Sequence, residues 1–255
     1  MKIWNVLMAC MLALFSLCAL PCSDAWAQRT ITVAVDGDWA PMKMKDDKGN
    51  LTGFEIEMMQ AIGAEAGFQV TFTEVPWENI FDGLDAGKFD AIIASVSITK
   101  ARKERFDFSR PYFHAEQLLV VQKAMALSSL KGKTIAAFDD TTGAAVLKKS
   151  ESVEKQFYPV GDTEKPFHDL AEGKVDGVLC DAPVAINYSF MKNAYIGKFA
   201  IASEGSVLGK PSEREEYAIV VKKGNADVLG LMNKGIQAVA DKKIDAGIKS
   251  KWIKW

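Results

Sequence analysis

The segment from Ser95 to Arg102 combines residue types that suit a bound carboxylate. Ser95 and Ser97 place hydroxyl groups on alternate residues of a predicted extended segment, and Thr99 is the expected N-cap of a short helix that carries Arg102. A guanidinium can hold both oxygens of a carboxylate, and serine hydroxyls and free backbone N–H groups at a helix start complete such a site. An ordinary capped helix with a solvated arginine explains the spacing equally well.

A second helix start has a similar composition. Asp140, Thr141 and Thr142 follow the predicted strand Thr134–Phe138 and precede a predicted helix over residues 144–149. Backbone N–H groups at this position favour an anion, so the same ligand could be held from two sides. The alternative is a plain Asp or Thr N-cap that needs no ligand.

Asp181 and two tryptophans complete the candidate set. Asp181 directly follows a predicted buried strand, where a carboxylate is costly unless it is paired with an ammonium group of a ligand or with a structural Lys or Arg. Trp39 and Trp77 are predicted in loops after strands, where their rings could enclose a ligand side chain, with hydrophobic packing as the alternative. Asp36 ends the first predicted strand beside Trp39.

The elements that position these residues alternate between strands and helices. Phe54, Met58, Ile62 and Ala66 recur every four residues, and Gly67 stands at the expected C-terminal cap of that helix. The other predicted elements of this region are strands 31–35, 70–72 and 91–94 and a helix over residues 79–86. This order predicts a βαβαβ unit with parallel strands.

An internal repeat predicts a second unit of the same kind. Residues 78–90 return as residues 164–176, at an offset of 86 without a gap, and share Glu, Phe, Leu, Gly, Lys and Asp. The offset maps Ser95 onto Asp181, so each would lie beyond the carboxyl end of a strand, where ligands bind in such sheets. The pattern favours two facing α/β lobes with a cleft between them, although convergent local patterning could give part of it.

Composition excludes several classes of protein. The 255 residues are 49% hydrophobic and 25% charged, which is typical of a globular protein, and the net charge of −2 does not favour nucleic acid as a partner. His114 and His168 lie far apart, so we expect no metal and no cofactor. Motifs of common enzymes are missing, although Asp36, Asp139, Asp140 or Glu116 could act as a general acid or base in a cleft.

The N-terminus has the pattern of a cleaved signal peptide. Lys2 precedes an apolar run, and the small-x-small sequence Ala25-Trp26-Ala27 predicts that residues 1–27 are removed on export. Cys10, Cys18 and Cys22 would leave with this segment. The mature chain would keep only Cys180, which we expect to be sheltered.

Three stretches of the sequence resemble the signatures of a known family. The stretches are Gly53–Glu57, Ser95–Arg102 and Phe106–Tyr112. They are similar to the Gly-Phe-Asp-x-Asp, Ser-Ile-Thr-x-x-Arg and Phe-Ser-x-Pro-Tyr motifs of solute-binding family 3, the extracellular receptors of ABC importers for polar amino acids. The resemblance covers nearly all of residues 30–255. It implies an α/β fold of two Rossmann-like lobes joined by two hinge strands, the type II periplasmic binding protein fold.

The resemblance also implies roles for individual residues. Arg102 would grip the α-carboxylate of the ligand, together with Ser97 and the backbone of Thr142. Asp181 would hold the α-ammonium group with the Ser95 carbonyl. The full set of expected ligand-binding residues is Asp36, Trp39, Trp77, Ser95, Ser97, Arg102, Asp140, Thr141, Thr142 and Asp181.

Two matches and one departure bear on the side chain that would be bound. Trp39 and Trp77 match positions that contact the ligand side chain in the family, and Asp140 stands where the family usually has glycine. With Asp36 and Asp139 nearby, Asp140 suggests a cationic side chain such as that of arginine, lysine or histidine. An outward-facing Asp140 would cancel that argument.

The family architecture implies a discontinuous first lobe. Residues 28–117 and 217–255 would form it, residues 118–216 would form the second lobe, and the hinge strands would lie near Gln117–Val121 and Tyr217–Val221. The ending Lys251–Trp255 would pack back on the first lobe.

The sequence thus predicts a periplasmic, monomeric, non-enzymatic receptor that binds a polar, possibly basic, L-amino acid, closes by hinge bending and delivers it to an ABC permease in the inner membrane. The chief alternative is an enzyme on the same scaffold, such as a cyclohexadienyl dehydratase, which turnover of prephenate or arogenate would reveal. A third hypothesis is a sensory protein that signals through a separate membrane partner.

Overall fold

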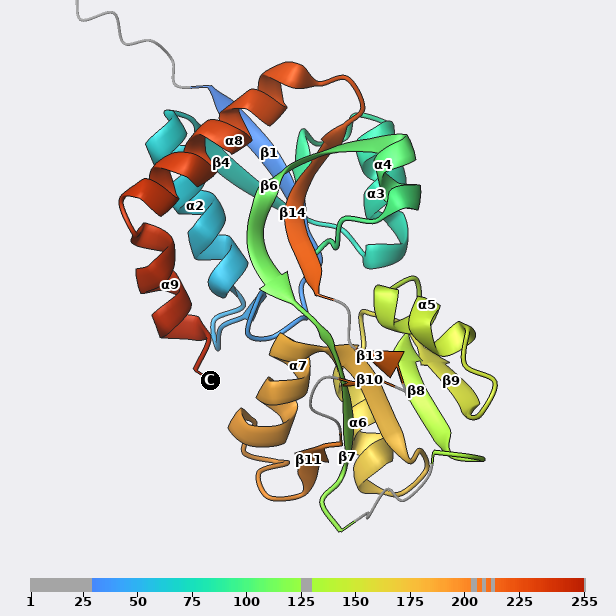
Figure 1. The fold of residues 1–255 in the computed structure, drawn as a ribbon. Coiled ribbons are helices and arrows are strands. Elements are labelled where there is room, and N and C mark those ends of the chain that lie inside the picture. The colour runs from blue at the N-terminus through green and yellow to red at the C-terminus, as the bar shows by residue number, and fades with distance from the viewer. Residues whose placement is uncertain (1–28, 125–129, 203–205, 208–209, 212–213, 255) are drawn as a thin grey trace, which may run out of the picture.

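The computed structural model describes residues 29–124, 130–202, 206–207, 210–211 and 214–254, which form two α/β lobes (Figure 1). The predicted signal peptide, with Cys10, Cys18 and Cys22, and Trp255 of the predicted C-terminal segment lie outside the described residues. Within the described part, no helix has both the length and the apolar character needed to cross a membrane.

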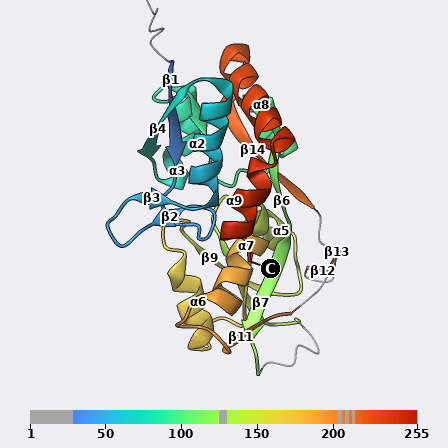
Figure 2. The same ribbon diagram turned by 90° about the vertical axis from the view of Figure 1, so that its left-hand side faces the viewer.

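The first lobe is built on a five-stranded mixed sheet. Its strands, in spatial order, are β4 (Gln69–Glu74), β1 (Thr30–Val35), β5 (Ala91–Ile92), β14 (Glu215–Lys222) and β6 (Phe106–Ala115). β1 pairs in parallel with β4 and β5, which confirms the predicted βαβαβ unit, whereas β14 is antiparallel to both of its neighbours. The helices of this lobe are α2 (Phe54–Ala66), α3 (Trp77–Asp85), α4 (Lys100–Arg105), α8 (Ala226–Asp241) and α9 (Ile244–Trp252). Figures 1 and 2 show α2, α8 and α9 packed together on one side of the sheet.

The second lobe has its own five-stranded sheet. Its strands, in spatial order, are β11 (Phe199–Ile201), β7 (Gln117–Gln122), β10 (Gly177–Asp181), β8 (Thr134–Phe138) and β9 (Glu154–Tyr158). Its helices are α5 (Thr142–Lys148), α6 (Glu164–Ala171), α7 (Ala182–Ile186) and the π-helical turn η1 (Asn187–Met191). Two small hairpins pair β2 (Met44–Lys45) with β3 (Leu51–Thr52) and β12 (Ser206–Val207) with β13 (Lys210–Pro211). Two packed α/β lobes confirm the predicted fold class.

The internal repeat of the sequence returns as the same structure in each lobe. Gly87 and Gly173, which are 86 residues apart, both have positive φ, at 70° and 74°. Each ends the turn after a helix, where only glycine takes that conformation without steric cost. Three residues later the Asp90 carboxylate accepts a hydrogen bond from the N–H of Thr32, and the Asp176 carboxylate accepts one from Thr134, both at 2.8 Å. The shared residues therefore tie each helix–turn–strand to the first strand of its own lobe.

The chain crosses between the lobes at two places. β6 ends at Ala115 and β7 begins at Gln117. On the return, β14 begins at Glu215 and takes Tyr217 into the first sheet. The predicted hinge segments Gln117–Val121 and Tyr217–Val221 therefore lie inside sheets, and the crossings fall immediately before them. Figure 1 shows the two crossings next to each other.

Local sequence signals explain two of the helix ends. α2 spans Phe54–Ala66 and stops at Gly67, whose φ of 88° is the left-handed cap that the sequence predicts. Thr99 accepts a hydrogen bond from the Arg102 N–H at 3.2 Å, as predicted for an N-cap. The prediction for Trp77 was wrong in detail, because this residue lies in the first turn of α3 and not in the preceding loop.

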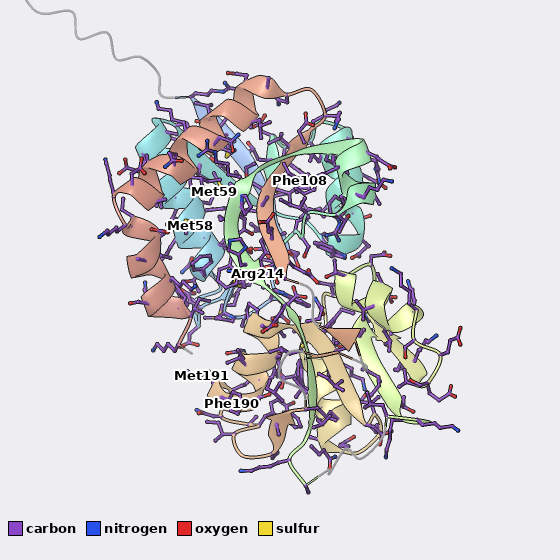
Figure 3. All side chains as sticks on the ribbon, in the orientation of Figure 1. Met58, Met59, Phe108, Phe190, Met191 and Arg214 are labelled. Atoms are coloured by element: carbon purple, nitrogen blue, oxygen red, sulfur yellow. The ribbon has the colours of Figure 1, made fainter. Side chains whose placement is uncertain are left out.

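The C-terminal helix packs against α2, as predicted for the end of the chain. Lys251 on α9 pairs with Glu57 on α2, and Ile253 is buried. Met58 and Met59 of α2, labelled in Figure 3, are also buried. Phe190 and Met191 of η1, by contrast, are 53% and 44% exposed on one side of the second lobe, which leaves some apolar surface there.

Two glycines in α8 give a matched test of helix packing. A Cβ at Gly235 would lie 2.4 Å from the carbonyl oxygen of Ile62 on α2, whereas a Cβ at Gly230 would meet nothing within 4 Å. Gly235→Ala is expected to destabilise the fold by roughly 1–3 kcal/mol through overpacking. Gly230→Ala is expected to stabilise it by about 0.5–1 kcal/mol, since alanine favours helix. Chemical denaturation measures both, and equal effects of the two substitutions would contradict this packing.

Candidate functional site

A cavity between the lobes brings together nearly all of the predicted binding residues. It is lined by Asp36, Trp39, Lys43, Trp77, Ala94, Ser95, Ser97, Arg102, Thr141, Thr142, Val160 and Asp181. Nine of the ten predicted residues are in this set, and Asp140 is the exception. About 20 Å³ is open to the centres of water molecules, which is room for one or two waters.

Arg102 lies at the boundary between the lobes. Its Nη1 donates to the Ser97 carbonyl at 3.0 Å, and its Nη2 donates across the cleft to the Asp140 carbonyl at 3.2 Å. The rings of Trp77 and Phe81 lie 5.4 and 5.3 Å from the guanidinium carbon, which fixes the plane of the group. A guanidinium has five N–H donors, so further donors remain for a ligand carboxylate.

Arg102 is half-buried and lies close to several carboxylates. Burial lowers the pKa of its guanidinium, whereas the nearby carboxylates of Glu215 and Asp181 act in the opposite direction. An arginine starts from a pKa so high that it keeps its positive charge in such a site.

Glu215, which the sequence analysis missed, engages the hydroxyl groups near Arg102. Ser97 Oγ and Thr142 Oγ1 both donate to its carboxylate, the latter at 2.8 Å. Gln117 Nε2 donates to the other oxygen at 3.0 Å. A ligand carboxylate can therefore accept hydrogen bonds from these two hydroxyls only if it shares them with Glu215 or displaces the Glu215 carboxylate. The N–H donors of Arg102 make no hydrogen bond to Glu215.

Asp181 ends β10 on the second lobe, at the position the repeat predicts. Its carboxylate accepts hydrogen bonds from Gln117 Nε2 and from the Tyr217 hydroxyl. Burial, with the Glu215 carboxylate as a second cause, raises the pKa of Asp181 to about 6. A cationic group placed beside it would favour its charged form.

A buried ion cluster lies on the first-lobe side of the cavity. Lys43 Nζ is 3.2 Å from Asp36 Oδ1, at angles that do not meet those of a hydrogen bond, and 3.8 Å from Glu55 Oε2. The Lys43 side chain is only 1% exposed. Burial raises the pKa of Asp36, against the opposing effect of Lys43.

Glu55 holds the backbone and the hydroxyl group of Ser95 by hydrogen bonds. Its Oε1 accepts hydrogen bonds from Ser95 N at 2.7 Å, from Ser95 Oγ at 3.0 Å and from the Tyr112 hydroxyl. Ser95 has a positive φ of 52°, so the prediction of an extended segment was wrong at this residue. Its hydroxyl is held by Glu55, although Ser95 still lines the cavity.

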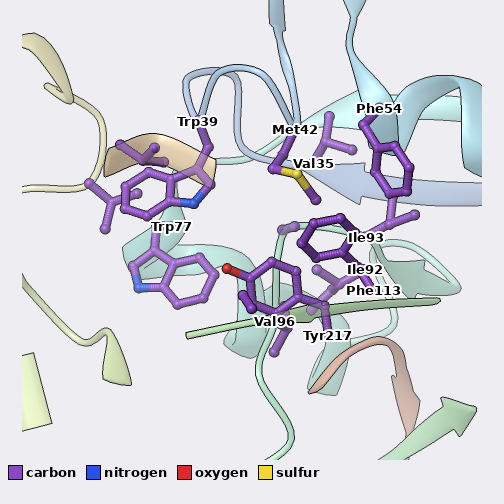
Figure 4. Packing of buried hydrophobic residues seen from close by; sticks show 14 of the residues in the cluster. Val35, Trp39, Met42, Phe54, Trp77, Ile92, Ile93, Val96, Phe113 and Tyr217 are labelled. Carbon is purple, nitrogen blue, oxygen red and sulfur yellow. The ribbon is translucent and has the colours of Figure 1, made fainter. Parts of the chain in front are cut away.

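The two tryptophans lie one above the other at the edge of the apolar cluster (Figure 4). Trp39 packs edge-on against Phe138 of the second lobe, with ring centroids 4.9 Å apart. Its Nε1 is buried and has no hydrogen-bond partner among the described residues. Thr163 Oγ1 adds a second contact between the lobes by donating to the Asp38 carbonyl at 2.7 Å.

The acidic residues of the second lobe point away from the cavity. Asp139 and Asp140 are exposed, and only the carbonyl of Asp140 reaches Arg102. Asp140 has a positive φ of 56°, the backbone conformation that glycine adopts most easily. Thr141, as predicted for an N-cap, accepts a hydrogen bond from the Ala144 N–H at 3.1 Å. The argument for a cationic ligand side chain therefore loses two of its three carboxylates.

The remaining acid–base and metal candidates lie elsewhere. Glu116 lines a separate groove, with Arg214 and Lys249. Among the described residues, one group with metal-ligand spacing exists, formed by His168, Asp169 and Glu172 on and beside α6. Lys165, Lys174 and Tyr158 bind the Asp169 carboxylate and hold its pKa well below the usual range, so that its oxygens are already engaged.

Comparison with known proteins identifies the family of the chain. Residues 31–254 match the profile of the bacterial extracellular solute-binding proteins, family 3. The chain belongs to this family. The L-cystine-binding protein TcyJ of Escherichia coli K12 is 27% identical over 232 residues, which are 89% of this chain and 82% of TcyJ.

Solved structures of the family share the fold. An ancestral arginine-binding protein bound to glutamine has a TM-score of 0.78 and 30% identity, covering 89% of this chain and 99% of that one. The ancestral amino acid-binding protein AncCDT-1, described as a precursor of cyclohexadienyl dehydratase, has a TM-score of 0.76 and 25% identity, over 88% and 95% of the two chains. This solute-binding chain is thus similar to amino-acid-binding proteins, one of which is described as the precursor of an enzyme.

Lys43, Glu55, Gln117, Glu215 and Tyr217 are the residues that sequence reasoning missed. Glu55 stands inside a stretch that resembles a family signature, and its acidic type there was the available signal. Glu215 and Tyr217 begin the strand that returns to the first lobe. Nothing in the spacing around Lys43 predicts a buried lysine.

Proposed function

We propose that this chain is the periplasmic solute-binding component of an ABC importer and that it binds a polar L-α-amino acid between its lobes. The observation that carries the proposal is the placement of Arg102 and Asp181 on opposite lobes of one cavity. A guanidinium and a carboxylate facing one enclosed space match the α-carboxylate and the α-ammonium group of an amino acid.

The lobes would close on the ligand. Arg102 already reaches the Asp140 carbonyl across the cleft, and Trp39 packs on Phe138, so the closed arrangement has direct contacts of its own. A ligand held by both lobes binds the closed form better than the open one, and this difference in affinity drives closure. In this proposal the chain acts as a monomer, without metal or cofactor, and delivers its ligand to a permease in the inner membrane.

The similar proteins favour binding over catalysis. TcyJ is named as a binding protein, and the ancestral structure with 30% identity holds glutamine. AncCDT-1 keeps a cyclohexadienyl dehydratase as the second candidate, because it is described as a precursor of that enzyme.

A thermal-shift screen separates the two candidates. The refolded, ligand-stripped protein would be tested against the twenty L-amino acids, prephenate and arogenate. An amino acid at about 100 times its Kd is expected to stabilise the fold by roughly 2.7 kcal/mol. Turnover of prephenate or arogenate, or no stabilisation by any amino acid, would contradict the receptor proposal.

A further inference from the structure

Lys43 is the one cation on the first-lobe wall of the cavity besides Arg102, among the described residues. A short turn fixes its backbone, since Trp39 N donates to the Lys43 carbonyl at 2.9 Å. Gly53 packs directly on this turn, and a Cβ there would lie 2.9 Å from Lys43 Cα. The lysine is therefore held in the wall of the cavity and does not extend into solvent.

The ionisable residues that line the cavity are two carboxylates and two cations, with Glu55 and Glu215 directly behind them. The lining residues are Asp36, Asp181, Lys43 and Arg102. If Arg102 and Asp181 hold the two α-groups of an amino acid, Lys43 is the cation that remains for Asp36 on the wall and for Glu55 behind it. The 3.2 Å ion pair between Lys43 and Asp36 leaves no unpaired carboxylate on the wall of the side-chain site.

A charged ligand side chain would meet a like charge at this pair. A guanidinium or ammonium group brought to Asp36 would lie next to Lys43, and juxtaposed like charges cost several kcal/mol. A carboxylate brought to Lys43 would lie next to Asp36 and near Glu55. Both classes of charged side chain are therefore disfavoured.

The Trp39 indole has a hydrogen-bond donor that suits an uncharged polar ligand side chain. Trp39 lines the cavity and is 4% exposed, and its buried Nε1–H has no hydrogen-bond partner among the described residues. A buried donor that stays unpaired costs about 1–3 kcal/mol. A ligand side chain with an acceptor oxygen can remove this cost.

We infer that Lys43 determines the specificity of the site: it neutralises Asp36, excludes cationic side chains, and leaves a subsite for an uncharged side chain that accepts a hydrogen bond from Trp39. This inference rests on the proposed function and narrows its ligand class. The inferred ligand class differs from the basic amino acids that the acidic residues of the sequence suggest.

The test is calorimetric titration of the wild-type protein and of Lys43→Met with L-glutamine, L-asparagine, L-leucine, L-arginine and L-lysine. The wild-type protein is expected to bind glutamine or asparagine at least about tenfold more tightly than the other three. Lys43→Met is expected to gain at least about tenfold in affinity for arginine or lysine, because Asp36 becomes available as their partner.

Two further variants test whether the ligand preference depends on the Lys43–Asp36 pair and on Trp39. Asp36→Asn/Lys43→Met removes the pair as a whole and is expected to gain no affinity for a basic amino acid, because it lacks the Asp36 carboxylate. If Lys43→Met does not fold, the preference of the wild-type protein among the five amino acids carries the test. Trp39→Phe is expected to weaken the neutral polar ligand about tenfold more than it weakens L-leucine, because only the polar ligand loses a hydrogen bond.

Three results would overturn the inference. The first is wild-type binding of arginine or lysine as tight as that of any neutral amino acid. The second is an unchanged ligand preference in Lys43→Met, and the third is a gain of arginine binding in the double variant. Binding of no amino acid at all by the wild-type protein would contradict the proposed function itself, and it is distinguishable from the other three.

Discussion

Arg102→Ala is expected to weaken amino-acid binding by at least about 100-fold. The substitution removes the partner of the ligand α-carboxylate in a largely buried site, and truncating one member of such a pair costs about 2–5 kcal/mol. It also removes the hydrogen bond to the Asp140 carbonyl, one of the contacts between the lobes. Titration followed by tryptophan fluorescence measures the loss, because Trp39 and Trp77 line the cavity.

Arg105→Ala is the matched control. Arg105 lies on the same short helix but is exposed and pairs with Asp82 and Asp85 on the outer surface of the first lobe. Its loss is expected to leave the ligand affinity unchanged. A loss of less than about tenfold in Arg102→Ala relative to Arg105→Ala would contradict the role of Arg102 in binding.

Asp181→Asn is expected to have opposite effects on binding and on the stability of the ligand-stripped protein. Binding should weaken by at least about 100-fold, since the carboxylate is the partner of the α-ammonium group. The ligand-stripped fold should become more stable at pH 7, because the wild-type protein must keep a buried carboxylate charged beside Glu215. An asparagine can still accept a hydrogen bond from Gln117 and donate one to the Tyr217 oxygen.

The direction of the pH dependence follows from the raised pKa of Asp181. Between its ordinary value of 3.8 and about 6, the folded chain binds more protons than the unfolded chain. The stability that this group contributes is thus fully present below about pH 4 and is lost as the pH rises through about 6. The loss at pH 7 is on the order of 1–3 kcal/mol, and Asp181→Asn should remove it.

Ligand binding should show the opposite pH trend. The α-ammonium group requires the charged form of Asp181, so the affinity should fall as the pH is lowered through about 6, with protons released on binding. Melting curves and titrations at pH 5 and 7.5 test both trends. The exposed Asp139→Asn is the control, and the same pH profile in Asp181→Asn as in the wild-type protein would contradict the assignment.

The sequence predicts the elements of this fold because their signals are local. Helix α2 follows from the four-residue spacing of Phe54 to Ala66 and from Gly67, and both the spacing and the cap are properties of neighbouring residues. The repeat predicts that Ser95 and Asp181 lie at equivalent strand ends, because Asp90 and Asp176 anchor the same turn in each lobe.

The contribution of the antiparallel strands β14 and β6 to the site could not be predicted from local signals alone. Glu215 and Tyr217 reach the site only because the chain returns to the first sheet about a hundred residues after leaving it. Neither residue has a spacing that marks it as part of a site. Their contacts with Ser97 and Asp181 arise from the tertiary fold alone.

The charge balance of the cavity was the least predictable property. Asp36, Asp139 and Asp140 suggest an acidic pocket in the sequence, but the structure turns two of them outward and pairs the third with Lys43. Lysine is almost never fully buried unless it is paired, so composition gives no reason to expect one in the cavity wall. Ligand class therefore depends on side-chain orientation, which the sequence pattern does not determine.

The central claim is that one cavity holds the α-carboxylate and the α-ammonium group of an amino acid from opposite lobes. Calorimetric titration of the wild-type protein with its preferred amino acid, with the α-carboxamide of that amino acid and with its deamino analogue tests this claim most directly. We predict that the amino acid binds and that each analogue loses at least about 100-fold in affinity. Equal binding of either analogue, or no binding of any amino acid, would contradict the claim.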